Sequence, residues 1–281
     1  MGEPTAESRG AERSSTLSIE VANGVARLRL DRPGAANAMS EPMWFELRDA
    51  VRALDDDPAV RVLVISGNGK HFCSGIDLSM LGGLQQTATD PSPGHGADKL
   101  RRTILDLQDC LTAVERCRKP VIAAVHGACV GAGLDLAVAC DLRYASADAR
   151  FVLKEVDMGL AADVGVLQRL PRIVGEGVAR ELAYTCRPVD GAEAAAMRLV
   201  NEVLPDPAAL EERVATVAAE LAAKSPLAMR GTKHAITYAR DHSVADGLEQ
   251  IATWNSGALM SADLHEAMAA FTEKRPADHR D

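Results

Sequence analysis

The sequence predicts an α/β fold, because strand and helix patterns alternate over its first two thirds and helical patterns fill the remainder. Apolar runs such as VRVLVISG and PVIAAVHG are short and rich in β-branched residues, which is typical of buried strands. The chain of 281 residues is long enough for one large domain, and 47% of its residues are hydrophobic. Only 3% are aromatic, so the core must consist mainly of Ala, Val, Leu and Ile.

The predicted sheet begins with a hairpin, because LSIEV and VARLRL flank Asn23-Gly24, a strong turn signal. Residues 82–97 are rich in Gly, Pro and Thr, which predicts a mobile loop. The next helix is expected to begin at Asp98, as its N-cap, and to end near Cys117. The other expected elements are helix 41–54, strands 60–67 and 120–127, a Gly-rich turn entering a helix at 128–141, strands 142–146 and 149–156, and helices 164–175, 177–186, 191–197, 207–224, 226–240, 243–257 and 261–273.

The chain divides into three expected regions. Residues 1–15 are polar and are expected to form a disordered tail, while residues 16–205 form the α/β core. Residues 206–281 form a helical region with apolar side chains, including Trp254 and Leu259, that need cover. We therefore expect this last region to serve in self-association.

Charge and composition exclude several classes of function. The net charge of −9 argues against nucleic acid as a partner, because phosphate binding needs clustered Lys and Arg. No apolar stretch is long enough to cross a bilayer, so no membrane insertion is expected. The six cysteines form no CxxC pair and indicate no metal site. The polar N-terminus lacks a signal pattern and the final PADHRD matches no organelle address, so a cytoplasmic location is expected.

Two Gly-rich turns each place a backbone N–H near a helix start, where amides lack partners within the helix. The first is SGIDL, with Ile76 at its centre, and the second is GAG, with Ala132 at its centre. Brought together, these two amides would form an oxyanion hole for a carbonyl that gains negative charge. Neither stretch fits a Walker A loop or a dinucleotide fingerprint. Glycine near a helix start is also common for close packing alone.

The stretch KEVDMGLAADVG, residues 154–165, places three carboxylates among apolar residues. Buried carboxylates are costly unless they are paired or used. Asp163 is also a possible N-cap of the following helix, a position that Asp favours. Glu155 and Asp157 are also compatible with a solvated strand end.

Four motifs together resemble the crotonase (enoyl-CoA hydratase/isomerase) superfamily: RPGAANAM, GKHFCSGIDL, AAVHGACVGAGLDLAVACDLRYAS and QRLP. The resemblance extends from about Leu17 to Arg275 with the motifs in family order. It implies a spiral of ββα units with a helical C-terminal trimerisation region, assembled as trimers or dimers of trimers. It also implies acyl-CoA thioester substrates, with coenzyme A as part of the substrate and no separate cofactor.

The acids resemble those of one branch of this superfamily, the dienoyl-CoA isomerases. Hydratases use two glutamates, at the positions of Asp135 and Glu155, and usually have glycine at the position of Asp163. The branch converts 3,5-dienoyl-CoA to 2,4-dienoyl-CoA in the breakdown of unsaturated fatty acids. This reaction removes a proton at C2 and adds one at C6, which suits two separate carboxylates. By analogy Glu155 is assigned to C2 and Asp163 to C6, although the reverse stays open, and Asp135 orients or polarises the pocket.

The resemblance also implies ligand contacts from the two turns and from the C-terminal segment FTEKRP, which in the family reaches an acyl-CoA held by a neighbouring subunit. A solvated helix end is the alternative for FTEKRP. Ala132 departs from the glycine usual in the family, but its amide is retained. The implied contacts are Ser74, Gly75, Asp77, Leu78, Gly131, Gly133, Phe271 and Lys274, with Lys274 on a phosphate.

Two other functions compete with diene isomerisation. One is enoyl-CoA hydration, or another crotonase-type reaction of a CoA thioester. The shorter Asp135 argues against hydration, because it would hold a water-activating carboxylate further back. The other is a noncatalytic fold that binds acyl-CoA or RNA, against which the three acids and the negative charge both argue.

Overall fold

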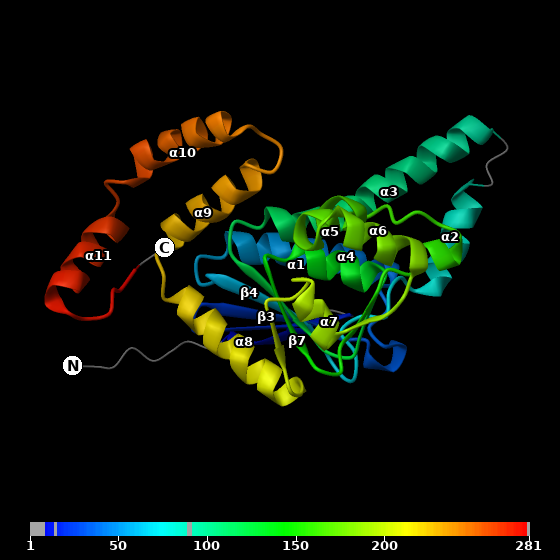
Figure 1. The fold of residues 1–281 in the computed structure, drawn as a ribbon, viewed down its shortest axis with the longest axis horizontal. Helices are drawn as coiled ribbons and strands as arrows, with labels where there is room; N and C mark the ends of the chain where they lie inside the picture. The colour runs from blue at the N-terminus through cyan, green and yellow to red at the C-terminus, as the bar shows by residue number, and fades with distance from the viewer. Residues whose placement is uncertain (1–8, 14–15, 89–91, 280–281) are drawn as a thin grey trace.

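The computed structural model describes residues 9–13, 16–88 and 92–279. A seven-stranded sheet has the strand order β1-β2-β3-β4-β5-β7-β10, and helices cover both of its faces (Figure 1). Its strands are β1 (Arg9–Arg13), β2 (Leu17–Ala22), β3 (Val25–Leu30), β4 (Val62–Gly67), β5 (Val121–Val125), β7 (Leu142–Ser146) and β10 (Glu202–Leu204). The sequence prediction of an α/β class is confirmed.

The central strands are parallel, from β3 through β4, β5 and β7 to β10. Every residue of β4 is buried, as expected for a parallel strand covered on both faces. Its alternate residues face two separate cores. Leu63 and Ile65 pack with α1 (Glu41–Asp56) and α3 (Pro93–Arg116), while Val62 and Val64 pack with α8 (Pro207–Ala222). The predicted hairpin of β2 and β3 is confirmed, and Asn23 and Gly24 both have the positive φ that its turn requires.

A second, three-stranded sheet positions the second Gly-rich turn. It has the order β6-β8-β9, from β6 (Ala128–Val130), β8 (Arg150–Val152) and β9 (Val189–Asp190). Gly131 follows β6 and donates its N–H to the Val152 carbonyl over 2.9 Å. The chain then turns directly into α4 (Ala132–Ala139), which is buried along its whole length. The small sheet therefore fixes where α4 begins.

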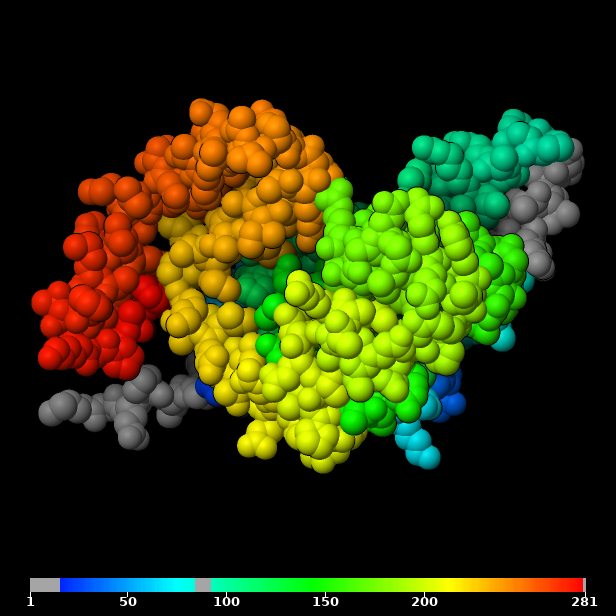
Figure 2. Space-filling model, in the orientation of Figure 1, coloured from blue at the N-terminus to red at the C-terminus, as the bar shows by residue number. Residues whose placement is uncertain are grey.

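Helices form the outer layers of the fold and the C-terminal region. Three C-terminal helices extend away from the body, and Figure 2 shows a hollow between them (gold to red) and the green body. No helix in the described ranges is long and apolar enough to cross a membrane. The remaining helices are α1 (Glu41–Asp56), α2 (Leu78–Ala88), α3 (Pro93–Arg116), α5 (Val166–Val174), α6 (Glu176–Thr185), α7 (Gly191–Ala196), α8 (Pro207–Ala222), α9 (Pro226–Tyr238), α10 (Val244–Ala258) and α11 (Ala262–Glu273).

The C-terminal helices expose large apolar side chains, as the sequence predicts. Trp254 is partly covered by α9, where it stacks on His234 with ring centroids 5.9 Å apart. Leu259 is exposed, and so are further apolar residues of this region. These are Ile236, Val244, Leu248, Met260, Met268 and Phe271.

The structure differs from the sequence predictions at the N-terminus and in residues 82–97. Residues 9–13 form strand β1, which pairs with β2, where a disordered tail was expected. Strand pairing uses backbone groups, so the polar sequence did not reveal it. The predicted loop 82–97 lies largely in helices, because α2 continues to Ala88 and α3 begins at Pro93. Proline suits the first turn of a helix, and α3 begins at Pro93 with Ser92 as its N-cap. Asp98 therefore lies inside α3 and is not its N-cap.

Candidate active site

The two Gly-rich turns and the segment of Glu155 converge at one point. A Cβ atom placed on Gly131 would lie 3.1 Å from Glu155 Oε1 and 4.0 Å from the Cα of Gly75. Gly75 and Gly131 have φ angles of 110° and 49°, in the region that glycine alone adopts readily. Glycine at both positions therefore allows the turns to approach each other and the carboxylate.

The Ile76 and Ala132 amides are free to bind a ligand. Met39 donates its N–H to the Gly75 carbonyl over 2.8 Å, and Asp77 donates to the Met39 carbonyl over 3.0 Å. Since N–H directions alternate along an extended chain, the Ile76 N–H points away from Met39. Ala132 is the first residue of α4, so its N–H has no acceptor within the helix. In the described part of the chain, neither N–H donates to a backbone carbonyl.

Other residues of the two turns have structural contacts. A Cβ on Gly133 would lie 2.6 Å from the Cys73 carbonyl oxygen, so this glycine permits close packing of α4. Asp77 Oδ1 accepts hydrogen bonds from the Ser79 N–H and hydroxyl, and Asp77 Oδ2 lies 2.9 Å from Arg32 Nη1. The Ser79 hydrogen bonds and then Arg32 lower the pKa of Asp77, which therefore stays ionised at the start of α2.

The outer residues of the first turn differ in their surroundings. Ser74 donates its N–H to the Ala36 carbonyl over 3.0 Å, which ties the turn to the loop before α1. Leu78 is 69% exposed, so its apolar side chain lacks cover in the single chain. Both residues belong to the turn that carries the Ile76 amide, and neither observation indicates a catalytic role.

Asp135 joins α4 to α5. It lies in the first turn of α4, has no exposed surface, and accepts the Val166 N–H on Oδ1 over 2.6 Å. Val166 is the first residue of α5, so Asp135 caps that helix from outside. Its Oδ2 has no hydrogen-bond partner among the described residues. Burial, and then the charge of Glu155, raise the pKa of Asp135 to about 8.

Glu155 and Asp163 are less buried than Asp135. Glu155 is partly exposed, and its Oε2 is buried with no hydrogen-bond partner in the described chain. Burial raises the pKa of Glu155, and the charge of Asp163 acts in the same direction. Burial also raises the pKa of Asp163. The charge of Asp163 therefore acts on both Glu155 and Asp135, and all three acids favour the protonated form more than a fully solvated carboxyl does.

The N-cap interpretation of Asp163 is wrong. The N-cap of α5 is Gly165, and no side chain of the local segment caps this helix. Asp163 lies two residues earlier, and its carbonyl accepts a hydrogen bond from Gln108 of α3. The solvated interpretation does hold for Asp157, which is exposed and lies 2.5 Å from Lys154 Nζ.

A single chain does not bring the C-terminal candidates to these acids. Phe271 lies on α11 and is 87% exposed, and Lys274 follows the helix in a left-handed conformation. Figure 1 shows α11 at the far end of the molecule from α4 and α5. In the described residues, no group of three His, Cys, Asp or Glu side chains is arranged to hold a metal ion.

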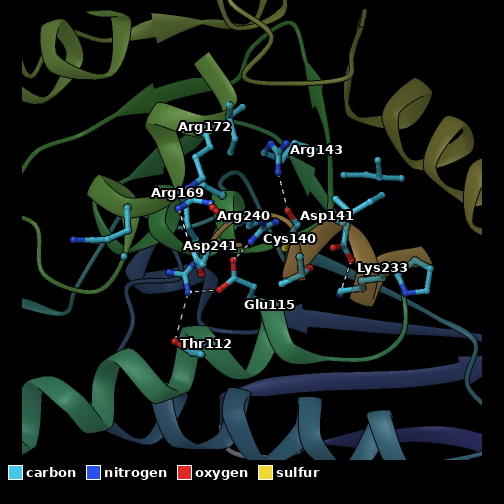
Figure 3. Close-up of a pocket in the computed structure, with 18 of the residues that line it drawn as sticks. Thr112, Glu115, Cys140, Asp141, Arg143, Arg169, Arg172, Lys233, Arg240 and Asp241 are labelled. Carbon is cyan, nitrogen blue, oxygen red and sulfur yellow. Dashed lines mark hydrogen bonds and ion pairs between the residues drawn. The ribbon is translucent and has the colours of Figure 1, made fainter. Parts of the chain in front are cut away.

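Asp163 also lines a charged pocket between α3, α5 and α9, which Figure 3 shows. Arg169 of α5 pairs with Glu115 of α3, and Lys233 of α9 pairs with Asp141, over 2.9 Å and 2.7 Å. The sequence reasoning missed Arg169 and Gln108 as residues of this site. Arg169 belongs to the motif QRLP, but its contact with Glu115 joins residues 54 positions apart and leaves no local signal.

The chain belongs to the enoyl-CoA hydratase/isomerase family, whose pattern it matches over residues 20–281. It is 47% identical over 254 residues to the peroxisomal Delta(3,5)-Delta(2,4)-dienoyl-CoA isomerase of Arabidopsis thaliana, covering 90% of this chain and 91% of that protein. It is 43% identical to the mitochondrial protein of that name from Homo sapiens, covering 89% and 77%. The crystal structure of a putative enoyl-CoA hydratase from Streptomyces coelicolor A3(2) has a TM-score of 0.87 at 33% identity, covering 99% of both chains.

The raised pKa of Asp135 predicts a pH-dependent stability. Its pKa rises from 3.8 to about 8 on folding, so the folded protein keeps a proton that the unfolded chain releases. The stability that this bound proton contributes is fully present below the unfolded pKa of 3.8. It is lost progressively as the pH rises towards the folded pKa of about 8. Asp135→Asn removes this titration, and its side-chain oxygen can still accept the Val166 N–H.

We expect the free energy of unfolding of Asp135→Asn, relative to wild type, to increase by up to about 1.4 kcal/mol for each pH unit between about pH 5 and about pH 8. Urea unfolding of both proteins across this range measures the difference. A difference independent of pH would show that Asp135 is ionised in the folded protein throughout.

Proposed function

We propose that this protein isomerises 3,5-dienoyl-CoA to 2,4-dienoyl-CoA, with Glu155 and Asp163 moving the protons. The observation that carries the proposal is the position of Glu155 against the second Gly-rich turn, next to two amides that donate to no described backbone carbonyl, with the charge of Asp163 acting on Glu155. The two relatives named as dienoyl-CoA isomerases, at 47% and 43% identity, support the same reaction.

The position of Glu155 favours its assignment to C2. Its Oε1 lies against Gly131, the residue before the Ala132 amide. Because C2 is bonded to the thioester carbonyl carbon, the base for C2 must lie close to the oxyanion hole. Asp163 lies later in the same stretch, close to the start of α5, and is left for C6, further along the acyl chain.

The reaction then proceeds by two proton transfers. The Glu155 carboxylate takes a proton from C2, and the electron pair delocalises through the diene onto the thioester oxygen. The Ile76 and Ala132 N–H groups stabilise this dienolate oxygen. Protonated Asp163 gives its proton to C6, and the 2,4-diene forms. Burial raises the pKa of Asp163, which favours the protonated form that this step requires.

Asp135 has a supporting role in this mechanism. Its pKa of about 8 keeps it largely neutral at pH 7, so its burial adds no charge beside Glu155. Its hydrogen bond to the Val166 amide holds the start of α5, directly after the segment that carries Asp163. We therefore assign Asp135 to orienting the site, rather than to moving a proton of the substrate.

Enoyl-CoA hydration is the second candidate, since the Streptomyces coelicolor A3(2) structure is titled a putative enoyl-CoA hydratase. A hydratase of this family needs a second carboxylate to activate water. Asp135 occupies that position, but it caps α5 and holds a proton near neutral pH. The geometry therefore favours isomerisation over hydration.

We further propose that the chain functions as a trimer or a dimer of trimers, with Phe271 and Lys274 reaching the acyl-CoA of a neighbouring subunit. The exposed apolar side chains on α9, α10 and α11 support this proposal, because they need cover in water. A cytoplasmic location stays a prediction, and the names of the Arabidopsis thaliana and Homo sapiens relatives assign those proteins to the peroxisome and the mitochondrion.

Replacing Asp163 tests the isomerase directly. Asp163→Asn removes the ionisable group with little change in shape, so isomerisation of 3,5-octadienoyl-CoA should fall by about 10² to 10⁴-fold. The isomerase activity of Glu155→Gln should fall by a similar factor. The neighbouring control variant Asp157→Asn should keep wild-type activity. Ultraviolet absorbance follows the diene, with crotonyl-CoA hydration measured in parallel. A folded Asp163→Asn protein with near wild-type isomerase activity, or a wild type that only hydrates crotonyl-CoA, would reject the proposal.

Replacing Ala132 tests the oxyanion hole. Proline is tolerated at the first position of a helix, so Ala132→Pro should fold while losing one N–H donor. We expect kcat for isomerisation to fall by about 10² to 10³-fold. Ala132→Gly is the matched control, because it keeps the N–H and should remain active. Equal activity of the proline and glycine variants would exclude the Ala132 amide from the mechanism.

The oligomer is tested by its mass. Size-exclusion chromatography with light scattering should give three or six times the chain mass of 29.8 kDa at micromolar concentration. Assembly is expected because it would bury the exposed apolar side chains of α9, α10 and α11 between subunits. A purely monomeric protein with full activity would reject both the proposed oligomer and the proposed roles of Phe271 and Lys274.

A further inference from the structure

We propose that Gln108 and Arg169 are positioning residues that set the location of the Asp163 carboxyl, and that Glu115 and Arg240 hold Arg169 in place. This inference rests on the proposed role of Asp163 in isomerisation. None of the four residues belongs to the Gly-rich turns or to the three acids. They come from α3, from α5 and from the residues just after α9.

The Asp163 carboxyl depends on its backbone for its position. No hydrogen bond from another described residue reaches its side chain, and only burial and its own amide shift its pKa. Whatever holds the main chain of residues 163–165 therefore also determines where the carboxyl lies. Misplacing a reacting group by about 1 Å can cost on the order of 10²-fold in rate.

Gln108 holds this main chain from one side. It lies on α3, and its Nε2 donates to the carbonyl oxygen of Asp163 over 2.6 Å. The contact joins residues that are 55 positions apart in the sequence. A polar side chain on α3 thus holds the backbone of Asp163 by a direct hydrogen bond.

Arg169 holds the same main chain from another side. Its Nη1 donates to the Val164 carbonyl over 3.4 Å. A Cβ on Gly165 would lie 1.8 Å from Arg169 Nη1, so the guanidinium rests directly against the Gly165 backbone. Gly165 also has a φ of 126°, which favours glycine. The absence of a side chain at residue 165 therefore makes room for the guanidinium.

Glu115 fixes the guanidinium from α3. Its Oε2 lies 2.9 Å from Arg169 Nη2, and Thr112 on the same helix lies 3.4 Å from that nitrogen. The Arg169 and Glu115 side chains are only 13% and 20% exposed, so solvent screens this pair weakly. Figure 3 shows Arg169 directed towards Glu115 and Thr112 across the pocket.

Arg240 ties this network to the C-terminal helices. Its Nη1 pairs with Glu115 Oε1, so Glu115 bridges two guanidinium groups. Burial acts to raise the pKa of Glu115, but its bonds and charge interactions with Arg169 and then Arg240 outweigh this and lower it. Arg172 of α5 also donates to the Arg240 carbonyl over 2.9 Å. The residues just after α9 thus help to hold in place the segment that carries Asp163.

The test compares steady-state kinetics of the full-length protein with variants that remove each brace. Gln108→Leu and Arg169→Met keep much of the side-chain volume but remove the donors. We expect kcat for 3,5-octadienoyl-CoA to fall by about 10 to 10²-fold, with KM within about twofold of wild type. Gln108→Lys restores a donor and should recover part of kcat. Arg180→Met, which removes an exposed ion pair on α6, is the matched control and should behave as wild type.

Isotope exchange separates positioning from general damage. In deuterium oxide, the brace variants should still exchange the C2 proton through Glu155, while label at C6 of the product falls with kcat. The ratio of C2 exchange to C6 labelling should therefore rise above that of wild type. A loose fold would lower both together. Glu115→Gln keeps an acceptor for Arg169 and should show the same change more weakly, which provides a test if Arg169→Met does not fold.

Two outcomes overturn the inference. One is wild-type kcat in folded Gln108→Leu and Arg169→Met, and the other is a parallel loss of C2 exchange and C6 labelling. An active wild type with unaffected brace variants rejects only the positioning role. A wild type without isomerase activity rejects the proposed function and this role with it.

Discussion

The hydrogen bond from the Val166 amide to the buried Asp135 carboxyl joins the two halves of the candidate site. α4 begins with the Ala132 amide, and α5 follows the segment that carries Asp163. Because Asp135 lies in the first turn of α4, this bond fixes the Ala132 amide relative to the segment of Asp163. Leaving one partner of such a buried bond unsatisfied costs about 1–3 kcal/mol, so the geometry of both halves depends on this contact.

The same burial distinguishes the three carboxyls from one another. Asp135 has no contact with solvent, Glu155 is partly covered, and Asp163 is the most exposed of the three. A carboxyl that loses its hydration holds its proton more tightly. Asp135 is therefore suited to remain neutral and support α5, while Glu155 and Asp163 keep enough access to change their protonation states.

The sequence identified the parts of the site whose signals are local. Glycines in two turns, three carboxyls in apolar surroundings and buried strands were all visible in short stretches, and the structure brings the turns and Glu155 together. The resemblance to a known family added the pairing of the turns. The N-cap alternative for Asp163 is wrong, since the side chain that accepts the Val166 N–H at the start of α5 is Asp135, 31 residues earlier.

Contacts between distant segments account for what the sequence did not reveal. Gln108 and Arg169 look like ordinary polar residues of amphipathic helices, and only the fold brings both to the backbone beside Asp163. The end of α2 and the start of α3 contain Gly and Pro. These residues predicted a loop there, although the segments form helices. Propensity is a weak guide where tertiary packing or a helix start decides the conformation.

The packing of Gly133 against Cys73 has a chemical consequence for a protein that handles thioesters. Cys73 immediately precedes the first Gly-rich turn, and an ionised sulfur there would be a nucleophile next to the turn that carries the Ile76 amide, which would suit an acyltransferase. The structure covers this sulfur completely, and burial raises the pKa of the Cys73 thiol to about 12. Thiolate is the attacking species, so the acyl group stays on coenzyme A and is not captured by the protein. Close packing at one glycine thus separates double-bond migration from acyl transfer.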